Sequence, residues 1–182
     1  MGNRLSKIVT RTGDAGETGL ADGSRIPKSG ARVQALGDVD ELNCCLGLLL
    51  THTVPDAVRE TLGRVQNELF NLGGELSMPG TALIDTVPTA MLEEDVERLN
   101  QHLPPLKEFV LPGGNAPAAA AHLARAVARR AERSLWVLND AEPLNPQALR
   151  YLNRLSDYLF VCARTLARSD GGREVMWKKP AL

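Results

Sequence analysis

The chain has 182 residues with 21 basic and 22 acidic side chains, which gives a formal net charge of −1. This length predicts a single domain, and the balanced charge argues against a general nucleic-acid-binding protein, which would carry a basic excess. Hydrophobic residues make up 43% of the chain and aromatic residues only 4%. That composition excludes a disordered chain and favours helices over sheets.

The cysteines and the apolar runs predict where the protein works. Cys44, Cys45 and Cys162 form no CxxC pair, which favours a reducing setting, and we expect all three to be small core residues on helices. No apolar run approaches the ~18 residues that a membrane span needs, and the first ten residues lack the apolar core of a signal peptide. We therefore expect a cytoplasmic protein without a membrane segment.

Hydrophobic periodicity divides the chain into an arm, a helical region and a tail. Residues 1–30 are polar and glycine-rich, whereas apolar residues then recur at three- and four-residue steps. The predicted helices run from Ala31 to about His52, from about Asp56 to Ser77, from Pro88 to about His102, from Asn115 to about Leu138, and from Pro146 to about Ser169. No segment has the period of a strand. We predict one all-α domain: a non-helical nucleotide-binding arm (1–30), an up-and-down five-helix bundle of ferritin-like topology (31–170) and a C-terminal tail (171–182).

The arm has the composition of an anion-binding loop. Between Thr10 and Leu20 three glycines allow tight turns that present backbone N–H groups, and three threonines add hydroxyl donors. Arg11 and Lys28 add positive charge, and Asp14 or Glu17 has the oxygen ligands that suit Mg²⁺. The spacing of a P-loop is missing. A flexible polar N-terminus without a ligand is the alternative reading.

The fourth predicted helix carries a row of charged residues at one-turn intervals, outside an apolar stripe that begins at Leu123. Its members are Arg125, Arg129, Glu132, Arg133 and Trp136. Such a row is either a solvated, self-paired face or a site for an anion, because arginine binds phosphate oxygens bidentately.

Other polar residues leave two readings open. Asn153 and Asp157 lie one turn apart on the fifth helix, where they are either exposed or placed to contact an adenine edge or a ribose. Asp40 on the first helix is expected to pair with an arginine such as Arg125 or Arg129, because an unpaired buried charge is costly. The scattered histidines (His52, His102 and His122) form no metal-binding spacing, so we interpret them as surface or core residues.

Several segments, in this order along nearly the whole chain, resemble the PduO-type ATP:cob(I)alamin adenosyltransferases. They are residues 10–18 (TRTGDAGET), Lys28, residues 37–43 (GDVDELN), 109–114 (FVLPGG), 125–133 (RAVARRAER) and 151–160 (YLNRLSDYLF). Arg11 stands where many members have lysine. The resemblance implies a homotrimer of helical bundles with active sites between subunits.

The resemblance also implies roles for individual residues. It assigns the ATP phosphates to the arm, through Thr10, Arg11, Thr12, Gly13, Asp14, Thr18, Gly19 and Lys28. It completes the nucleotide site from the two long helices, through Arg129, Arg130, Glu132, Arg133 and Asn153, with Glu132 as a candidate ligand of an ATP-bound Mg²⁺. Asp40 would pair with Arg125 across the subunit interface, and Phe109 would lie against the lower face of the corrin.

The implied reaction is the transfer of the 5′-deoxyadenosyl group of ATP to the cobalt of cob(I)alamin, which releases triphosphate and forms adenosylcobalamin. Cobalt is itself the nucleophile, so the protein needs only to align the substrates and stabilise the leaving charge. The expected partners are ATP, the corrinoid and an adenosylcobalamin-dependent enzyme that receives the product. A trimeric scaffold without activity and an ATP-binding sensor without turnover are the alternatives.

Overall fold

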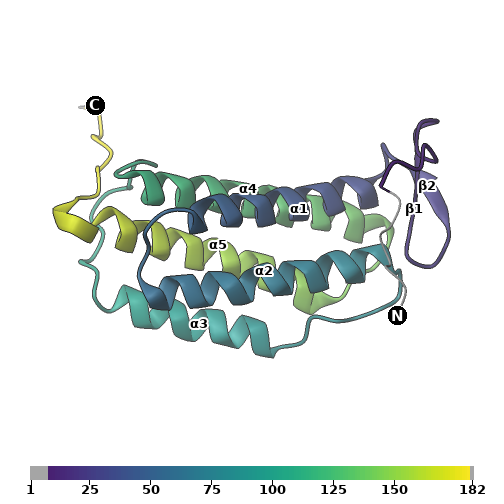
Figure 1. Cartoon of the computed structure of the whole chain (residues 1–182). Helices are drawn as coiled ribbons and strands as arrows, with labels where there is room; N and C mark the ends of the chain where they lie inside the picture. Colours follow the sequence, from purple (N-terminus) through teal and green to yellow (C-terminus); the bar gives the residue numbers. More distant parts are fainter. Residues whose placement is uncertain (1–7, 181–182) are drawn as a thin grey trace.

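The computed structural model describes residues 8–180 as a bundle of five long helices with a small hairpin at one end (Figure 1). The helices are α1 (Ala31–Leu50), α2 (Asp56–Ser77), α3 (Val87–Asn100), α4 (Ala116–Ala141) and α5 (Pro146–Ala167), followed by a 3₁₀ turn at Ser169–Gly171. The predicted all-α bundle is confirmed, and each helix end lies within about a turn of its predicted position.

Small and branched apolar residues hold the helices together. α4 packs against α1 and α5, α1 also contacts α2, and α3 contacts α5. Several alanines of α4 are completely buried, which lets neighbouring helices approach closely, among them Ala121, Ala124, Ala128 and Ala131. Leu123 was predicted to belong to this stripe but is 52% exposed. It lies about 100° around the helix from Ala124, outside the face that the other members share.

Two asparagines start the long helices and connect them to the rest of the bundle. The Asn115 side chain accepts a hydrogen bond from the Ala118 amide (3.0 Å) and donates one to the carbonyl of Leu166 (2.7 Å). Asn145 accepts from the Gln147 amide (3.0 Å) and donates to the carbonyl of Ile84 (2.7 Å). Both asparagines are therefore N-caps, and each also fixes its helix to a distant segment.

The arm contains strands that the sequence pattern did not predict. β1 (Glu17–Gly19) and β2 (Arg25–Pro27) form an antiparallel hairpin, with Thr18 opposite Ile26. Strands of three residues are too short to show an alternating pattern, so the expectation of no strand was wrong. The Ala21 amide donates to the carbonyl of Ser77 (2.9 Å) and thereby anchors the hairpin on the end of α2.

The segment after α5 folds back along the connector that precedes α4. Val110 and Met176 form an antiparallel bridge, and the Trp177 amide donates to the carbonyl of Phe109 (2.7 Å). This C-terminal segment lies at the end of the bundle opposite the hairpin (Figure 1). The arm and the connector that contains Phe109 thus lie at opposite ends of the molecule. The resemblance associates both segments with ligands.

The cysteines only partly follow their predicted burial. Cys162 is buried in α5, but Cys44 is exposed and Cys45 partly exposed on α1. Two adjacent helix residues point about 100° apart, so both cannot face the same core. Among residues 8–180, no helix is both long enough and apolar enough to cross a membrane.

Candidate functional site

The arm is a folded hairpin whose polar side chains remain accessible. The Thr10 and Thr12 hydroxyls are 3.0 Å apart, and Arg25 donates to the carbonyl of Thr12 (2.6 Å). Arg11 has a positive φ of 60°, a conformation that is uncommon outside glycine and is typical of functional loops. The sequence pattern did not single out Arg25, although this residue connects the start of the arm to the strands.

Gly13 allows a lysine to approach the backbone of the arm. A Cβ built on Gly13 would lie 3.0 Å from Lys28 Nζ, so a larger residue there would displace the ammonium group. The Lys28 amide donates to the carbonyl of Gly16 (2.8 Å), which closes the loop between them. Asp14 is exposed, and Thr18 and Gly19 lie on β1. The hairpin therefore gathers the arm residues expected to bind phosphate, with a cation at their centre.

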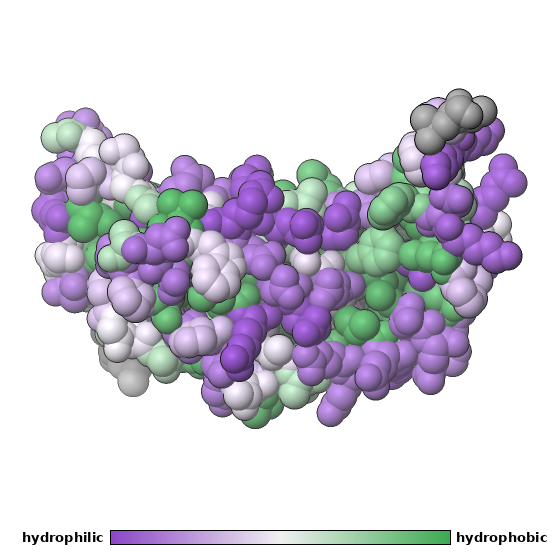
Figure 2. All heavy atoms as spheres, turned by 180° about the vertical axis from the view of Figure 1, so that it is seen from behind, coloured by the Kyte–Doolittle hydropathy of each residue, from purple (hydrophilic) through white to green (hydrophobic). Residues whose placement is uncertain are grey.

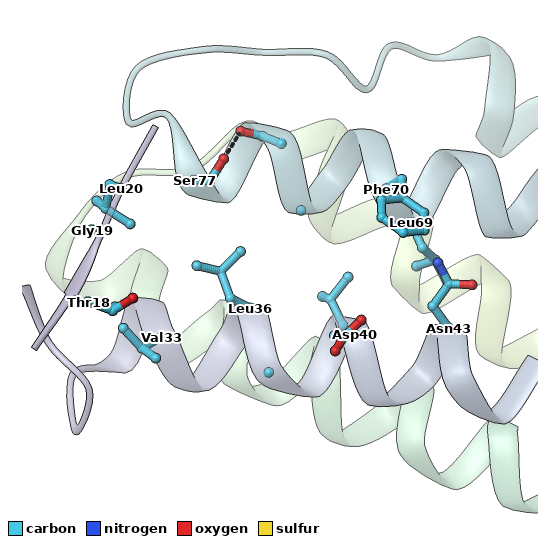
Figure 3. Close-up of a pocket in the computed structure, with 14 residues that line it drawn as sticks. Thr18, Gly19, Leu20, Val33, Leu36, Asp40, Asn43, Leu69, Phe70 and Ser77 are labelled. Atoms are coloured by element: carbon cyan, nitrogen blue, oxygen red, sulfur yellow. Dashed lines mark hydrogen bonds between the residues drawn. The ribbon is translucent and has the colours of Figure 1, made fainter. Parts of the chain in front are cut away.

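A groove of about 590 Å³ separates the hairpin, α1 and α2 (Figure 3). Thr18 and Gly19 line its end, while Asp40 enters it from α1 and Phe70 from α2. Phe70 is 74% exposed. Within residues 8–180, Asp40 has no ion-pair partner. This groove thus combines an unpaired carboxylate with exposed apolar surface.

The neighbouring Asp38, rather than Asp40, makes the contact between α1 and α4. Asp38 is 3% exposed, and its carboxylate accepts hydrogen bonds from Arg130 Nε (3.1 Å) and Ser134 Oγ (2.5 Å). Arg130 also pairs with Glu41, and that hydrogen bond raises the pKa of the Arg130 guanidinium. Arg130, which was expected to contact the nucleotide, joins α4 to α1 within the chain.

The remaining arginines of α4 have no acidic partner in the described part of the chain. Arg125 is half-buried, and burial followed by the charge of Arg129 lowers its pKa. Arg129 and Arg133 are exposed, with Arg133 Nη1 donating to the carbonyl of Arg129 (3.1 Å). Three like charges one turn apart repel each other. Within residues 8–180, the row is therefore not self-paired.

The nucleotide residues predicted on α4 and α5 meet each other. Asn153 Nδ2 donates to Glu132 Oε1 (2.9 Å), and both residues line a cavity of about 420 Å³ together with Trp136. Asp157 instead pairs with Arg154 (2.5 Å). The cavity offers an aromatic face, an amide and a carboxylate, which are groups suited to a nucleoside.

Phe109 and Arg125 share a third cavity, of about 450 Å³, near the C-terminal segment. Phe109 is 78% exposed, and its ring packs edge-on against Trp177 with a centroid distance of 6.3 Å. His122 and Phe160 form part of the wall. Apolar atoms gather toward this end of the molecule in Figure 2. His122 was interpreted from the sequence as a surface or core residue, although its position three residues before Arg125 places both residues on the same helix face.

One chain does not bring all of these residues together. The hairpin precedes α1, and the connector between α3 and α4, which contains Phe109, lies at the opposite end of the bundle (Figure 1). α1 has 20 residues, so about 30 Å separate the two ends. The charged row of α4 runs between them. Within one chain, the arm and Phe109 therefore lie about the length of the bundle apart.

Proteins of one family resemble this chain along nearly its full length. A family model described as cobalamin adenosyltransferase matches residues 8–166. A cobalamin adenosyltransferase of Cupriavidus metallidurans is 56% identical over 98% of both chains. A corrinoid adenosyltransferase of Mycobacterium tuberculosis is 43% identical over 98% of this chain and 96% of the relative.

A solved structure has nearly the same fold. It is a phenylalanine-to-alanine variant of the PduO-type ATP:corrinoid adenosyltransferase of Lactobacillus reuteri complexed with cobalamin and ATP, at 33% identity and a TM-score of 0.90. The match covers 95% of this chain and 100% of that chain. By sequence along almost its full length and by fold, this chain belongs to the cobalamin adenosyltransferase family.

Proposed function

We propose that this chain is an ATP:corrinoid adenosyltransferase that joins the 5′-deoxyadenosyl group of ATP to the cobalt of a cob(I)alamin-type corrinoid. Cobalt attacks C5′, the Co–C bond forms as the C5′–O bond breaks, and triphosphate leaves. Family membership supports the activity. The observation that carries the site is the cavity in which Phe109 and Arg125 lie together, at the end of an otherwise unpaired row of arginines.

The active site lies between subunits of a homotrimer. Asp40 lacks an ion-pair partner within the described residues, and the Arg125 Nε is buried without one. An enclosed N–H group without an acceptor is costly, so an Asp40–Arg125 contact between two copies would satisfy both groups. The same contact would bring the arm of one copy toward the cavity of the next, which the length of the bundle prevents within one chain.

The triphosphate is held by the arm of one copy and by the α4 row of its neighbour. Arg129 and Arg133 face the charge that develops on the leaving group, and Lys28 and the threonine hydroxyls bind the remaining oxygens. Fixed cations aimed at developing charge are a large source of rate acceleration. Asn153 and Glu132 orient the nucleoside.

Mg²⁺ accompanies the triphosphate rather than occupying a preformed protein site. Across residues 8–180, no group of three His, Cys, Asp or Glu side chains is placed to hold a metal. Glu132 and Asp14 are carboxylates suited to a single contact, and phosphate oxygens supply the others. Mg²⁺ would neutralise part of the triphosphate charge.

Phe109 covers the lower face of the corrin. Its exposed ring, supported by Trp177, presents an apolar surface that disfavours an axial water ligand on cobalt. Loss of that ligand makes reduction from Co(II) to Co(I) easier. We place the reaction in the cytoplasm, because the three cysteines are free, and expect the product to pass to an adenosylcobalamin-dependent enzyme.

The decisive experiment is anaerobic. Purified protein is mixed with chemically reduced cob(I)alamin and MgATP, and the cob(I)alamin spectrum is followed. We expect its replacement by the spectrum of a light-sensitive alkylcobalamin, with one triphosphate released per product. An unchanged spectrum relative to a protein-free control would contradict the proposal.

ATP-dependent stabilisation separates the remaining possibilities. ATP at about 100 times its Kd should stabilise the fold by roughly 2.7 kcal/mol. Stabilisation without turnover would identify a sensor, and the absence of both would identify a scaffold.

A further inference from the structure

A buried histidine in the wall of the Phe109 cavity has no hydrogen-bond partner among residues 8–180. His122 is 3% exposed, and its Nδ1 is enclosed and unpaired. Buried polar groups in folded proteins are nearly always paired. The imidazole packs beside Phe160, with ring centroids 6.3 Å apart, so its orientation is fixed by an aromatic neighbour rather than by a polar one.

The position of the ring leaves one nitrogen for a ligand. His122 lines the cavity together with Arg125 and Phe109, and since Nδ1 is enclosed, Nε2 is the nitrogen available to an occupant. Burial and the nearby Arg125 charge lower the pKa of His122, against a smaller opposing effect of Glu174. The imidazole is therefore neutral near pH 7 and suits a neutral hydrogen-bonding partner.

We propose that His122 Nε2 hydrogen-bonds a peripheral carboxamide of the corrin ring and so positions the corrinoid over Phe109. This inference rests on the proposed function. Corrin rings carry acetamide and propionamide side chains around an apolar macrocycle, and the cavity matches that character with aromatic rings and a few polar groups. In such a low-dielectric wall a hydrogen bond is stronger than in water.

The test is equilibrium binding of cob(II)alamin to the ATP-loaded protein. The His122→Phe variant preserves the ring packing but removes the hydrogen bond. We expect it to bind the corrinoid about three- to tenfold more weakly, which corresponds to the loss of one hydrogen bond. His122→Gln places an amide nitrogen near the position of Nε2 and should restore most of the affinity. His102→Phe, at an exposed site, is the matched control.

The readouts separate positioning from a structural role. We expect the KM for the corrinoid to rise in His122→Phe while the KM for ATP and the circular dichroism spectrum stay unchanged. The inference would be overturned if wild type and His122→Phe bound the corrinoid equally well, or if His122→Phe lost as much affinity for ATP as for the corrinoid. Either result would leave the proposed function intact. Failure of the wild-type protein to bind any corrinoid would overturn both.

Discussion

Arg164 and Glu174 form an ion pair that is almost completely enclosed, with side chains 4% and 1% exposed and a distance of 2.6 Å between Nε and Oε1. Arg168 adds a second contact to the same carboxylate at 3.1 Å. The pair holds the C-terminal segment on α5, and that segment places Trp177 against Phe109. A residue proposed to contact the corrin thus depends on a charge pair outside the cavity.

Removing one member of this pair should destabilise the fold. Glu174→Ala leaves the Arg164 charge buried without its partner, a change that typically costs about 3–5 kcal/mol. Chemical denaturation measures the effect. Glu93→Ala, which removes a half-exposed partner of Arg154, is the control and should cost less than about 1 kcal/mol. Similar losses in both variants would contradict the prediction.

The two aspartates of α1 should have separable roles. Asp38→Ala removes the acceptor of three donors from Gln34, Arg130 and Ser134, and we expect a loss of about 3 kcal/mol in the free energy of unfolding. Asp40→Ala should leave the helical content unchanged but weaken assembly, measured by sedimentation velocity. An Asp40 variant that assembles like wild type would argue against the intersubunit pair.

Arg129→Ala should reduce turnover through kcat. If Arg129 stabilises charge that develops on the leaving triphosphate, its loss should lower kcat about 100-fold. Steady-state kinetics with cob(I)alamin measure this effect. Arg59→Ala removes an arginine of α2 that lines none of the three cavities and should keep full activity. A wild-type kcat in Arg129→Ala would exclude this role.

Phe109→Ala should mainly impair activation of the oxidised substrate. The variant loses the apolar surface beneath the corrin, so the rate with cob(II)alamin and a reductant should fall more than the rate with prereduced cob(I)alamin. Comparing the two assays isolates the effect on reduction. A proportional loss in both assays would indicate that Phe109 acts on binding alone.

The depressed pKa of His122 should make stability depend on pH in a defined window. Burial lowers this pKa below its ordinary value of 6.5, so below pH 6.5 the unfolded chain binds a proton that the folded protein does not. The free energy of unfolding therefore decreases as pH falls from about 7.5 through 6.5, and levels off below the folded pKa.

The His122→Phe variant should lack this contribution. As the pH is lowered from 7.5 to 5.5, the free energy of unfolding of His122→Phe should increase relative to that of wild type. Urea denaturation measures this difference, with His102→Phe as the control. A constant difference across that range would show that His122 titrates alike in both states.

Sequence periodicity predicted the helices because leucines and alanines at one-turn intervals lie on one face only if the segment is helical, and that face can then be buried. It failed for Leu123 and Cys44, which lie at the edge of a stripe or beside it. The hairpin was missed because Arg25, rather than an alternating pattern, supports it. The candidate site residues were predicted from their order along the chain, and their roles stay predictions. The sequence pattern did not single out His122, because its place in the cavity wall depends on packing against Phe160 of α5.

Because the arm and Phe109 lie at opposite ends of the bundle, two differently inactive alleles should complement each other. A copy with a damaged arm still offers an intact corrin cavity to its neighbour, and a copy with a damaged cavity still offers an intact arm. If the protein forms the proposed homotrimer, mixed trimers of the two would contain some complete sites, whereas trimers of either allele alone would contain none. Partial recovery of growth or activity on co-expression is thus a genetic signature of this architecture.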